Sequence, residues 1–547
     1  MPPLCEGIAS QEEVPTMSDI KVFVIGIDAA TFDLLDPWID SGELPNIKSL
    51  LDSGCSGVLK STVPPLSAVA WPSLCTGVNP GKHGIFDFLH ESLDGTSIRF
   101  MNGSNCKAIP VWQYLNAAGY KTGLINIPMT YPPPKVEGFA ISGLDTPPKA
   151  KEFTYPPELG SRLTSAVNYV VELDHSLEQS PCLENYVNHI LDVVDKRDKA
   201  IQMMMSESCV DFFMAVFTES DRAQHFFWKY LDKDHPEYTS GYEDVILRVY
   251  RRIDEAIGKI LDRLNESAAV IVVSDHGMKG LYKSIDINQW LHENGYFQMK
   301  DTNFSMLVNL LKKAKNRIAG KRKVEGFHNR VNWDRTKAYH LGSWGNIFIN
   351  VKSRQPKGIV APGIEYELLR DELIEQLSRL KDPSNGRSVV REVKKKEELF
   401  SGEYMSHAPD LVVVWNDHYN CVKTSHQIGK KQKSDKDVFQ LGGVFSADHD
   451  SNGIFIIKSP LTLSGVRNMQ ADIVDIAATV LNIMGVAVPQ SMDGRVLQEV
   501  FREPCRAGSA VCVDTDLVEA RLSEEINYSE EDAEKVAERL RNLGYME

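Results

Sequence analysis

The sequence predicts an α/β protein built on an open, largely parallel sheet. Short apolar runs rich in β-branched residues alternate with segments whose apolar residues recur at helical spacing. The runs are apolar throughout, as in strands that are buried on both faces. Several of them end close to Asp or His, where open α/β sheets place their chemistry. The run Ala268–Val272, followed by Ser274-Asp275-His276-Gly277-Met278, combines these features most clearly.

Composition places the chain among ordinary globular proteins. Its 547 residues allow either one large α/β domain with insertions or two to three domains. The formal net charge of −15 argues against a nucleic-acid binder that works through a global positive field. The nine cysteines are odd in number and lack paired short spacings, so they indicate neither a disulfide framework nor a cysteine-type zinc module. A reducing cytosol is the expected compartment.

The N-terminal residues carry no secretory signal. We expect residues 1–17 to be a flexible extension, because they contain prolines and acidic residues but no basic or apolar signal region. No run of roughly eighteen apolar residues occurs anywhere, so no membrane-spanning helix is predicted.

Two candidate site residues lie among the first hundred. Ile20–Ile27 is predicted to be a buried strand that ends on Asp28, with a helix after it. After a strand at Gly57–Thr62, two prolines form a loop before a helix that starts near Ala68. Ser67 thus falls at a helix N-terminus, which favours a phosphate or an alkoxide. For both Asp28 and Ser67 the alternative is a plain helix N-cap.

The next candidates follow two further strands. Asp221 and His225 come after the apolar run Asp211–Thr218, and in a helix they would stand four apart on one face, close enough to hold one ion. The alternative is a surface pair. For Asp275-His276 the alternative is a turn with a capping carboxylate. The other elements expected here are strands at Thr122–Ile127 and Gly138–Leu144 and helices at Cys182–Met205 and Val245–Leu264.

From about Ile285 to Ser406 the α/β alternation becomes looser, which indicates an inserted cap. Within it, residues 304–323 are first apolar and then basic. They predict either a solvated helix face with a loop or a patch that attracts an anionic substrate or an anionic membrane surface. The α/β pattern returns with a strand at Asp410–Trp415. Another, Gly453–Lys458, follows His449, and helices are expected at Asp472–Gly485 and Glu530–Leu543.

The expected domains follow from these boundaries. They are an N-terminal extension (1–17), a core in two parts (18–284 and 407–500), an inserted cap or substrate region (285–406), and a C-terminal linker and helix (501–547). One more histidine, His83 in the turn Asn79–Gly84, is expected to fix its loop rather than to bind an ion.

These segments offer three carboxylates and three imidazoles near predicted strand ends. Such mixed oxygen and nitrogen ligands suit two divalent ions, Zn²⁺ or Mn²⁺, rather than Ca²⁺. Two ions a few ångströms apart stabilise the attacking and the leaving oxygen of an in-line phosphoryl displacement. The candidate residues are Asp28, Ser67, Asp221, His225, Asp275, His276 and His449.

This ordered set resembles the alkaline phosphatase superfamily, and within it the type I phosphodiesterase / nucleotide pyrophosphatase family in its prokaryotic phosphohydrolase and phosphomutase-like branch. Ser67 stands nine residues ahead of Thr76-Gly77, as the resemblance requires. The resemblance covers most of the chain. Further segments similar to that branch are Asn79–Phe88, Gln224–Trp228, Met492–Arg495 and Leu543–Tyr545.

The resemblance implies a three-layer α/β/α sandwich with a mixed, largely parallel central sheet and an inserted cap. It implies a hydrolase of phosphoric diester or pyrophosphate bonds that uses two divalent metal ions, Zn²⁺ as the first choice and Mn²⁺ as the second. One ion would lie on Asp221, His225 and His449, and the other on Asp28, Asp275 and His276 with Ser67 bridging. Ser67 would attack phosphorus, and water would hydrolyse the phosphoryl-Ser67 intermediate with net retention at phosphorus.

Two other functions stay open at this stage. One is a phosphomonoesterase or phosphomutase of the same superfamily, and the other is a metal-stabilised binding protein that keeps the ligands for folding energy. The expected partner is a small phosphoester, a nucleotide or a lipid-linked compound, with peripheral membrane contact through residues 304–323 as a weaker expectation. No specific nucleic-acid partner is expected.

The chain departs from its relatives next to Ser67. Nucleotide pyrophosphatases carry an Asn three residues after the nucleophile, which holds a non-bridging oxygen, and this chain has Ala70 there. Sulfatases carry Pro and Arg two and four residues after it, and this chain has Val69 and Trp71, which argues against formylglycine chemistry. The sequence leaves open which group contacts the phosphoryl oxygens.

Overall fold

The structure is a computed structural model of the chain. It describes residues 19–91, 98–174, 177, 182–300, 327–422, 438–441, 445–503, 511–514 and 525–542. The expected N-terminal extension and the apolar-then-basic stretch 304–323 lie outside these residues. No helix in the described ranges is long and apolar enough to cross a bilayer.

A nine-stranded sheet forms the centre of the fold, in the order β20-β2-β19-β9-β1-β8-β5-β6-β7. The strands are β1 (Val22–Ile27), β2 (Cys55–Lys60), β5 (Thr122–Ile127), β6 (Gly138–Ser142), β7 (Thr154–Tyr155), β8 (Phe212–Phe217), β9 (Ala269–Val273), β19 (Asn452–Lys458) and β20 (Val466–Asp472). β1 runs parallel to both β8 and β9, and β5 runs parallel to β8 and β6. β19 is antiparallel to β9 and β2, and β7 to β6. The predicted mixed, largely parallel sheet is therefore confirmed.

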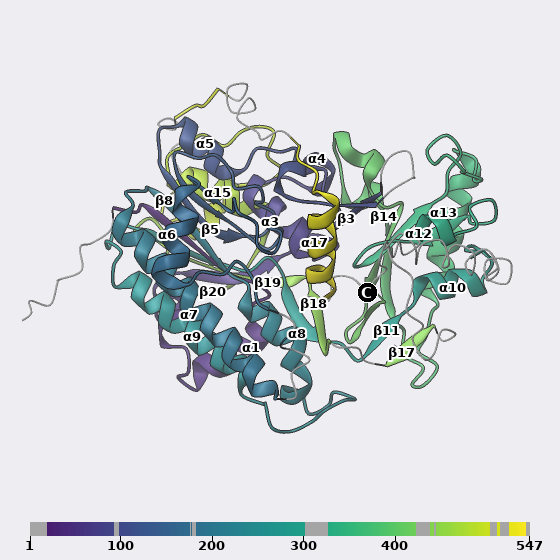
Figure 1. Cartoon of the computed structure of the whole chain (residues 1–547), viewed down its shortest axis with the longest axis horizontal. Helices are drawn as coiled ribbons and strands as arrows, with labels where there is room; N and C mark the ends of the chain where they lie inside the picture. Colours follow the sequence, from purple (N-terminus) through teal and green to yellow (C-terminus); the bar gives the residue numbers. More distant parts are fainter. Residues whose placement is uncertain are drawn as a thin grey trace, which may run out of the picture.

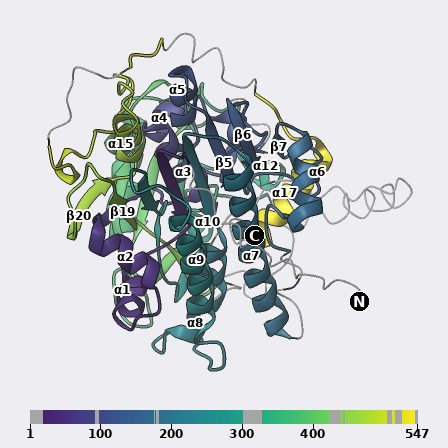
Figure 2. The ribbon, with the colours of Figure 1, turned by 90° about the vertical axis from the view of Figure 1, so that its left-hand side faces the viewer.

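Alternate residues of β1 pack into two separate cores, one on each face of the sheet. Phe23, Ile25 and Ile27 belong to one buried cluster, and Val22 and Val24 belong to the other. Helices that cover the first face are α1 (Phe32–Asp40), α2 (Pro45–Ser53), α6 (Glu158–Val167), α7 (Leu183–Glu207), α8 (Glu219–Leu231) and α9 (Val245–Leu261). The second face is covered by α3 (Ser67–Thr76), α5 (Val111–Ala117) and α15 (Asp475–Ile483). Figures 1 and 2 show these two helical layers on opposite sides of the sheet.

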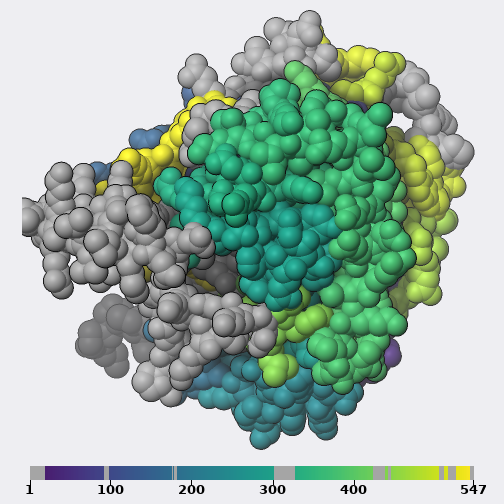
Figure 3. All heavy atoms as spheres, turned by 90° about the vertical axis from the view of Figure 1, so that its right-hand side faces the viewer, coloured from purple at the N-terminus to yellow at the C-terminus, as the bar shows by residue number. Residues whose placement is uncertain are grey.

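A second lobe is built on a four-stranded antiparallel sheet in the order β12-β13-β15-β14. Its strands and helices are α10 (Ile287–Glu293), α12 (Phe327–Arg330), β12 (Ala338–His340), β13 (Gly345–Ile349), α13 (Ile364–Ser378), β14 (Val390–Lys395), α14 (Lys396–Leu399) and β15 (Leu411–Trp415). A three-stranded sheet of β11 (Lys283–Ile285), β16 (Tyr419–Cys421) and β17 (Phe439–Leu441) lies beside it. Figure 3 shows the outer face of this lobe.

One strand was predicted in the wrong sheet. The sequence places Asp410–Trp415 back in the core, but β15 pairs with β13 and β14 of the second lobe. The run Leu-Val-Val-Val-Trp is almost fully buried, so its apolar pattern is the same as that of a central strand. The chain re-enters the central sheet only at β19, after β18 (Ala447–Asp450) has paired with β10 (Gly277–Gly280).

The second lobe also packs on α3. Leu66 and Val69, on either side of Ser67, belong to the same buried cluster as Leu341 and Trp344 of the second lobe. Ala70 and Trp71 of the same helix pack on the central sheet. The other α-helices and strands in the described ranges are α4 (Pro80–His83), the hairpin of β3 (Leu89–Glu91) and β4 (Ile98–Phe100), and the C-terminal helix α17 (Glu530–Asn542).

We predict that Gly26→Ala destabilises the fold. A Cβ atom at Gly26 would lie 2.6 Å from Cη2 of Trp71 and 2.8 Å from Cγ2 of Val216. Because both neighbours are buried, overpacking should lower the free energy of unfolding by about 1–3 kcal/mol, measured by urea denaturation. Wild-type stability of Gly26→Ala would contradict this account of the packing.

Candidate active site

Asp28 lies where β1 ends, and its carboxylate is fully buried. It does not cap α1, because Thr31 accepts the hydrogen bond from the Asp33 backbone. Trp71 Nε1 donates to Asp28 Oδ2 at 3.2 Å, whereas Oδ1 has no hydrogen-bond partner of good geometry. A buried carboxylate oxygen that accepts no hydrogen bond needs a partner of positive charge instead.

The first cluster combines Asp28, Asp275 and His276, whose ligand atoms all lie within 4.8 Å of one another. His276 Nε2 lies 3.1 Å from Asp275 Oδ2 and 3.7 Å from Asp28 Oδ1. Asp275 Oδ1 accepts from the Ala29 backbone at 3.3 Å, which leaves Oδ2 without a donor of good geometry. Ser67 Oγ stands 3.1 Å from His276 Nε2, so Ser67 joins this cluster.

The second cluster combines Asp221, His225 and His449. His225 Nε2 and His449 Nε2 lie 3.0 Å apart, and Asp221 Oδ1 lies 3.4 and 3.5 Å from them. Asp221 and His225 share one face of α8 and are buried, so they are not the surface pair that the sequence also allowed. His449 arrives on β18, opposite Met278 of β10.

The histidine tautomers favour cation binding in both clusters. Nδ1 of each imidazole faces a backbone carbonyl, at 2.7 Å for His225, 2.8 Å for His449 and 3.0 Å for His276. A neutral imidazole that donates from Nδ1 presents a lone pair at Nε2. Two Nε2 lone pairs 3.0 Å apart repel unless a cation lies between them and the carboxylate. The residues present therefore fit a metal ion in each cluster.

The two clusters are neighbours. The rings of His276 and His449 stack with their centroids 3.8 Å apart, although each belongs to a different cluster. The structure thus brings together all seven residues predicted from the sequence, from five segments of the chain. The chemical role of each residue is addressed under the proposed function.

Burial and like charge determine the protonation of the carboxyl groups. Burial, followed by Asp275 and Asp221, raises the pKa of Asp28 well above its ordinary value. Burial and Asp221 raise the pKa of Asp275 to about 6. Burial acts in the same direction on Asp221, but His225 and Arg222 hold the pKa of that carboxyl well below its ordinary value. Three carboxyl groups at one place thus favour a bound cation.

Burial also affects the imidazoles. It lowers the pKa of His276 to about 4, and burial together with His276 lowers the pKa of His449 to about 4. Both rings therefore stay neutral, and able to act as ligands, well below neutral pH.

Sequence reasoning missed three residues that support the clusters. Trp71 holds Asp28, and Arg222 contacts Asp221 and lies 3.3 Å from Glu172. Ser274 Oγ donates to the Ala30 carbonyl at 3.0 Å and accepts from the Ile454 backbone at 2.8 Å, which ties the strand end before Asp275 to its neighbours. Arg222 and Ser274 are each adjacent in sequence to a predicted ligand, and this adjacency was the one available signal. The contacts of Trp71 and Ser274 join distant segments, which the sequence does not reveal.

His83 fixes its loop, as predicted. Its Nε2 lies 2.9 Å from Ser73 Oγ, and Ile85 N donates to its Nδ1 at 3.2 Å. Ala70 is buried against the central sheet. This position therefore offers no polar group to a phosphoryl oxygen.

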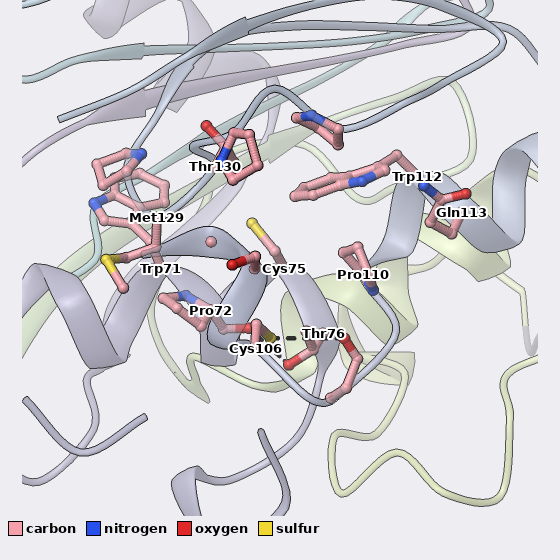
Figure 4. A pocket seen from close by; sticks show the side chains of 16 residues that line it. Trp71, Pro72, Cys75, Thr76, Cys106, Pro110, Trp112, Gln113, Met129 and Thr130 are labelled. Carbon is pink, nitrogen blue, oxygen red and sulfur yellow. Dashed lines mark hydrogen bonds between the residues drawn. The ribbon is translucent and has the colours of Figure 1, made fainter. Parts of the chain in front are cut away.

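A separate pocket lies behind Trp71. It is partly open to solvent and is lined by Trp71, Cys75, Trp112 and Met129 among others (Figure 4). None of the seven cluster residues lines it. Trp71 separates this pocket from Asp28, because its ring lines the pocket while its Nε1 donates to the carboxylate. The chemistry is therefore assigned to the clusters and not to the pocket.

The central sheet is mixed and has helices on both faces. Two carboxylate–imidazole clusters lie beside a serine at a helix N-terminus. Together these features define the class of alkaline-phosphatase-like hydrolases. The sequence profile described as type I phosphodiesterase / nucleotide pyrophosphatase matches residues 22–437. The chain therefore belongs to the type I phosphodiesterase / nucleotide pyrophosphatase family, and the resemblance seen in the sequence is confirmed. It is a hydrolase of this type.

Two solved structures with TM-scores above 0.5 show the same fold at low sequence identity. Phosphonoacetate hydrolase from Sinorhizobium meliloti in complex with phosphonoacetate is 16% identical with a TM-score of 0.52, and the complex with phosphonoformate is 15% identical with a TM-score of 0.51. Both matches cover 85% of this chain and 95% of the other. Human ectonucleotide pyrophosphatase / phosphodiesterase 5 is 14% identical over 88% of this chain and 100% of the other, with a TM-score of 0.49. No curated protein matches the chain.

We predict that the two clusters lose metal affinity at different pH. Below a pH of about 6, protonation of Asp275 competes with a cation at the cluster with Asp28 and His276, whereas Asp221 stays ionised. Between about pH 7.5 and about pH 5.5 the Zn²⁺ affinity of one site should fall more than that of the other, measured by titration against a competing chelator. Asp221→Asn should remove the site whose affinity is less sensitive to pH. Equal pH dependence of the two affinities would contradict the assignment.

Proposed function

We propose that the chain hydrolyses phosphoric diester or pyrophosphate bonds through a phosphoryl-Ser67 intermediate, with two divalent ions bound. One observation carries the proposal. Ser67 Oγ lies at the start of α3, beside the first cluster and 3.1 Å from His276 Nε2. A merely structural metal site would have no need of a hydroxyl in that position.

The helix N-terminus makes Ser67 a suitable place for a phosphoryl group. Backbone N–H groups of Val69 and Ala70 bond to the Leu66 carbonyl at 2.8 and 2.7 Å. Those of Ser67 and Ala68 precede the first intrahelical bond, so they point out of the helix end together with the positive end of its dipole. An anion at Ser67 Oγ is therefore stabilised by the backbone as well as by the clusters.

The serine hydroxyl lies next to a ligand atom of the first cluster. His276 Nδ1 faces the Gly277 carbonyl, so the lone pair of His276 Nε2 is available to a bound ion, and Ser67 Oγ lies 3.1 Å from it. An ion held there would lower the pKa of the Ser67 hydroxyl, whose proton passes to solvent. When bound, the divalent ions supply Lewis-acid stabilisation of charge on the attacking and leaving oxygens. The holding residues would be Asp28, Asp275, His276 and Ser67 for one ion and Asp221, His225 and His449 for the other. Their oxygen and nitrogen donors suit Zn²⁺ first and Mn²⁺ second.

The reaction then takes two displacements at phosphorus. Ser67 Oγ forms a bond to phosphorus while the bond to the leaving alcohol or phosphate breaks, and the leaving oxygen takes up a proton from solvent. Water then attacks the phosphoryl-Ser67 group, and the bond from phosphorus to the serine oxygen breaks. One proton of that water restores the Ser67 hydroxyl. Each displacement inverts the phosphorus centre, so the product retains configuration.

Ser67→Ala should abolish turnover without loss of metal. We expect hydrolysis of bis-p-nitrophenyl phosphate to fall by roughly three orders of magnitude or more, because the nucleophile is removed, while elemental analysis still finds two equivalents of Zn²⁺. Ser73→Ala is the matched control, since its hydroxyl lies in the same helix but contacts His83. A wild-type rate in Ser67→Ala would exclude Ser67 as the nucleophile.

The choice of a diester over a monoester is tested by paired substrates. A diester presents one negative charge on phosphorus and a monoester two, and the position of the oxyanion-binding Asn is occupied by Ala70. We expect kcat/KM to be higher for bis-p-nitrophenyl phosphate than for p-nitrophenyl phosphate. A strong preference for the monoester would favour the phosphomonoesterase or phosphomutase alternative.

A further inference from the structure

The two oxygens of Asp221 face different partners. Oδ1 lies 3.4 Å from His225 Nε2 and 3.5 Å from His449 Nε2, and it accepts no hydrogen bond of good geometry from the residues that the structure describes. Oδ2 contacts Nη1 of Arg222, the next residue of α8. The carboxylate is therefore divided between the position where a cation fits and a guanidinium.

Arg222 is held in this position from its other side as well. Its Nη2 lies 3.3 Å from Oε2 of Glu172, whose Oε1 accepts from the Leu173 backbone at 3.0 Å. The side chains of Arg222 and Glu172 are 2% and 1% exposed. Because a buried charge cannot exchange its partners for water, the guanidinium stays between the two carboxylates.

The first cluster holds its carboxylates by neutral donors instead. Trp71 Nε1 donates to Asp28 at 3.2 Å, and the Ala29 backbone donates to Asp275 at 3.3 Å. Two carboxylates thus face an ion at the first cluster. At the second cluster a single carboxylate faces the ion, and Arg222 offsets part of its charge. The two clusters therefore differ in electrostatics, although each combines three ligands.

The contact with Arg222 has two consequences for a cation on Asp221. Because Oδ2 is engaged, Asp221 offers one ligand oxygen rather than two, beside the imidazole nitrogens of His225 and His449. Three protein ligands leave a coordination position for an oxygen of another molecule. The charge of the guanidinium also weakens the attraction of the cluster for a cation, and it strengthens the attraction for an anion.

We propose that Arg222 is a positioning residue that lowers the metal affinity of the second cluster and raises the affinity of the metal-loaded cluster for an anionic oxygen. The inference rests on the proposed function only in the cation that both require at this cluster. In the proposed reaction, the consequence is that negative charge on an oxygen at this cluster is stabilised more strongly.

The test measures two affinities that Arg222 should affect in opposite directions. An Asp275→Asn background disables the first cluster, so that the second is titrated alone. Co²⁺ is the probe ion, because its visible absorption reports changes in its ligands. Its affinity is measured against a competing chelator. The affinity of the Co²⁺-loaded protein for inorganic phosphate is measured from the change in absorption.

The main variant combines Arg222→Gln with Glu172→Gln, so that the guanidinium and its second carboxylate partner are removed together. We expect Co²⁺ to bind roughly 10- to 100-fold more tightly and phosphate roughly 10-fold more weakly, because a positive charge has left the cluster. Glu172→Gln alone leaves the whole charge of Arg222 on Asp221. It should shift both affinities in the reverse direction, and it tests the inference even where the double variant does not fold.

The matched control removes another buried ion pair of α8. Arg197 Nη2 lies 2.8 Å from Glu219 Oε1, and both side chains are fully buried. Arg197→Gln combined with Glu219→Gln should leave both affinities unchanged. A merely structural role for Arg222 would lower the two affinities together. That result, unchanged affinities, or equal shifts in the control would overturn the inference. Absence of Ser67-dependent diester turnover in wild-type protein that binds metal would instead overturn the proposed function.

Discussion

The burial of three carboxyl groups at one edge of the sheet is the constraint on which the rest of the structure depends. Asp28, Asp221 and Asp275 lie at or just beyond the ends of adjacent parallel strands, where solvent cannot screen their charges. Each keeps one oxygen without a donor of good geometry. The imidazoles add lone pairs rather than protons, because their Nδ1 atoms face backbone carbonyls. Such a site is unfavourable when empty, and cations offset that cost when they bind.

The surrounding elements hold this unfavourable site in place. Backbone pairing of β10 with β18 positions His449, and Ser274 ties the end of β9 to β1 and β19. Trp71 fits against Gly26 and directs its indole N–H at Asp28. These contacts involve neutral groups, so they position the ligands without adding further charge to the site.

The local pattern of apolar residues in the sequence was sufficient to predict the carboxylates at the strand ends. It was not sufficient to predict all of the residues and pairings that surround them. Asp28 and Asp275 follow uninterrupted apolar runs, and parallel strands bring their ends to one edge. The strand at Leu411–Trp415 was assigned to the wrong sheet because its composition matches a central strand. His449 reaches the site on an antiparallel pairing across more than 170 positions, which periodicity does not reveal. The ordered motif set supplied His449, while the contact of Trp71 with Asp28 could be found only in the fold.

Helix α3 belongs to two cores at once. Leu66 and Val69 pack into the second lobe, while Ala70 and Trp71 pack on the central sheet. A movement of the second lobe relative to the central sheet would therefore also disturb α3 and the serine at its start. A chimera that exchanges residues 285–441 for those of a relative would stay active only if it preserved the surface that meets Leu66 and Val69.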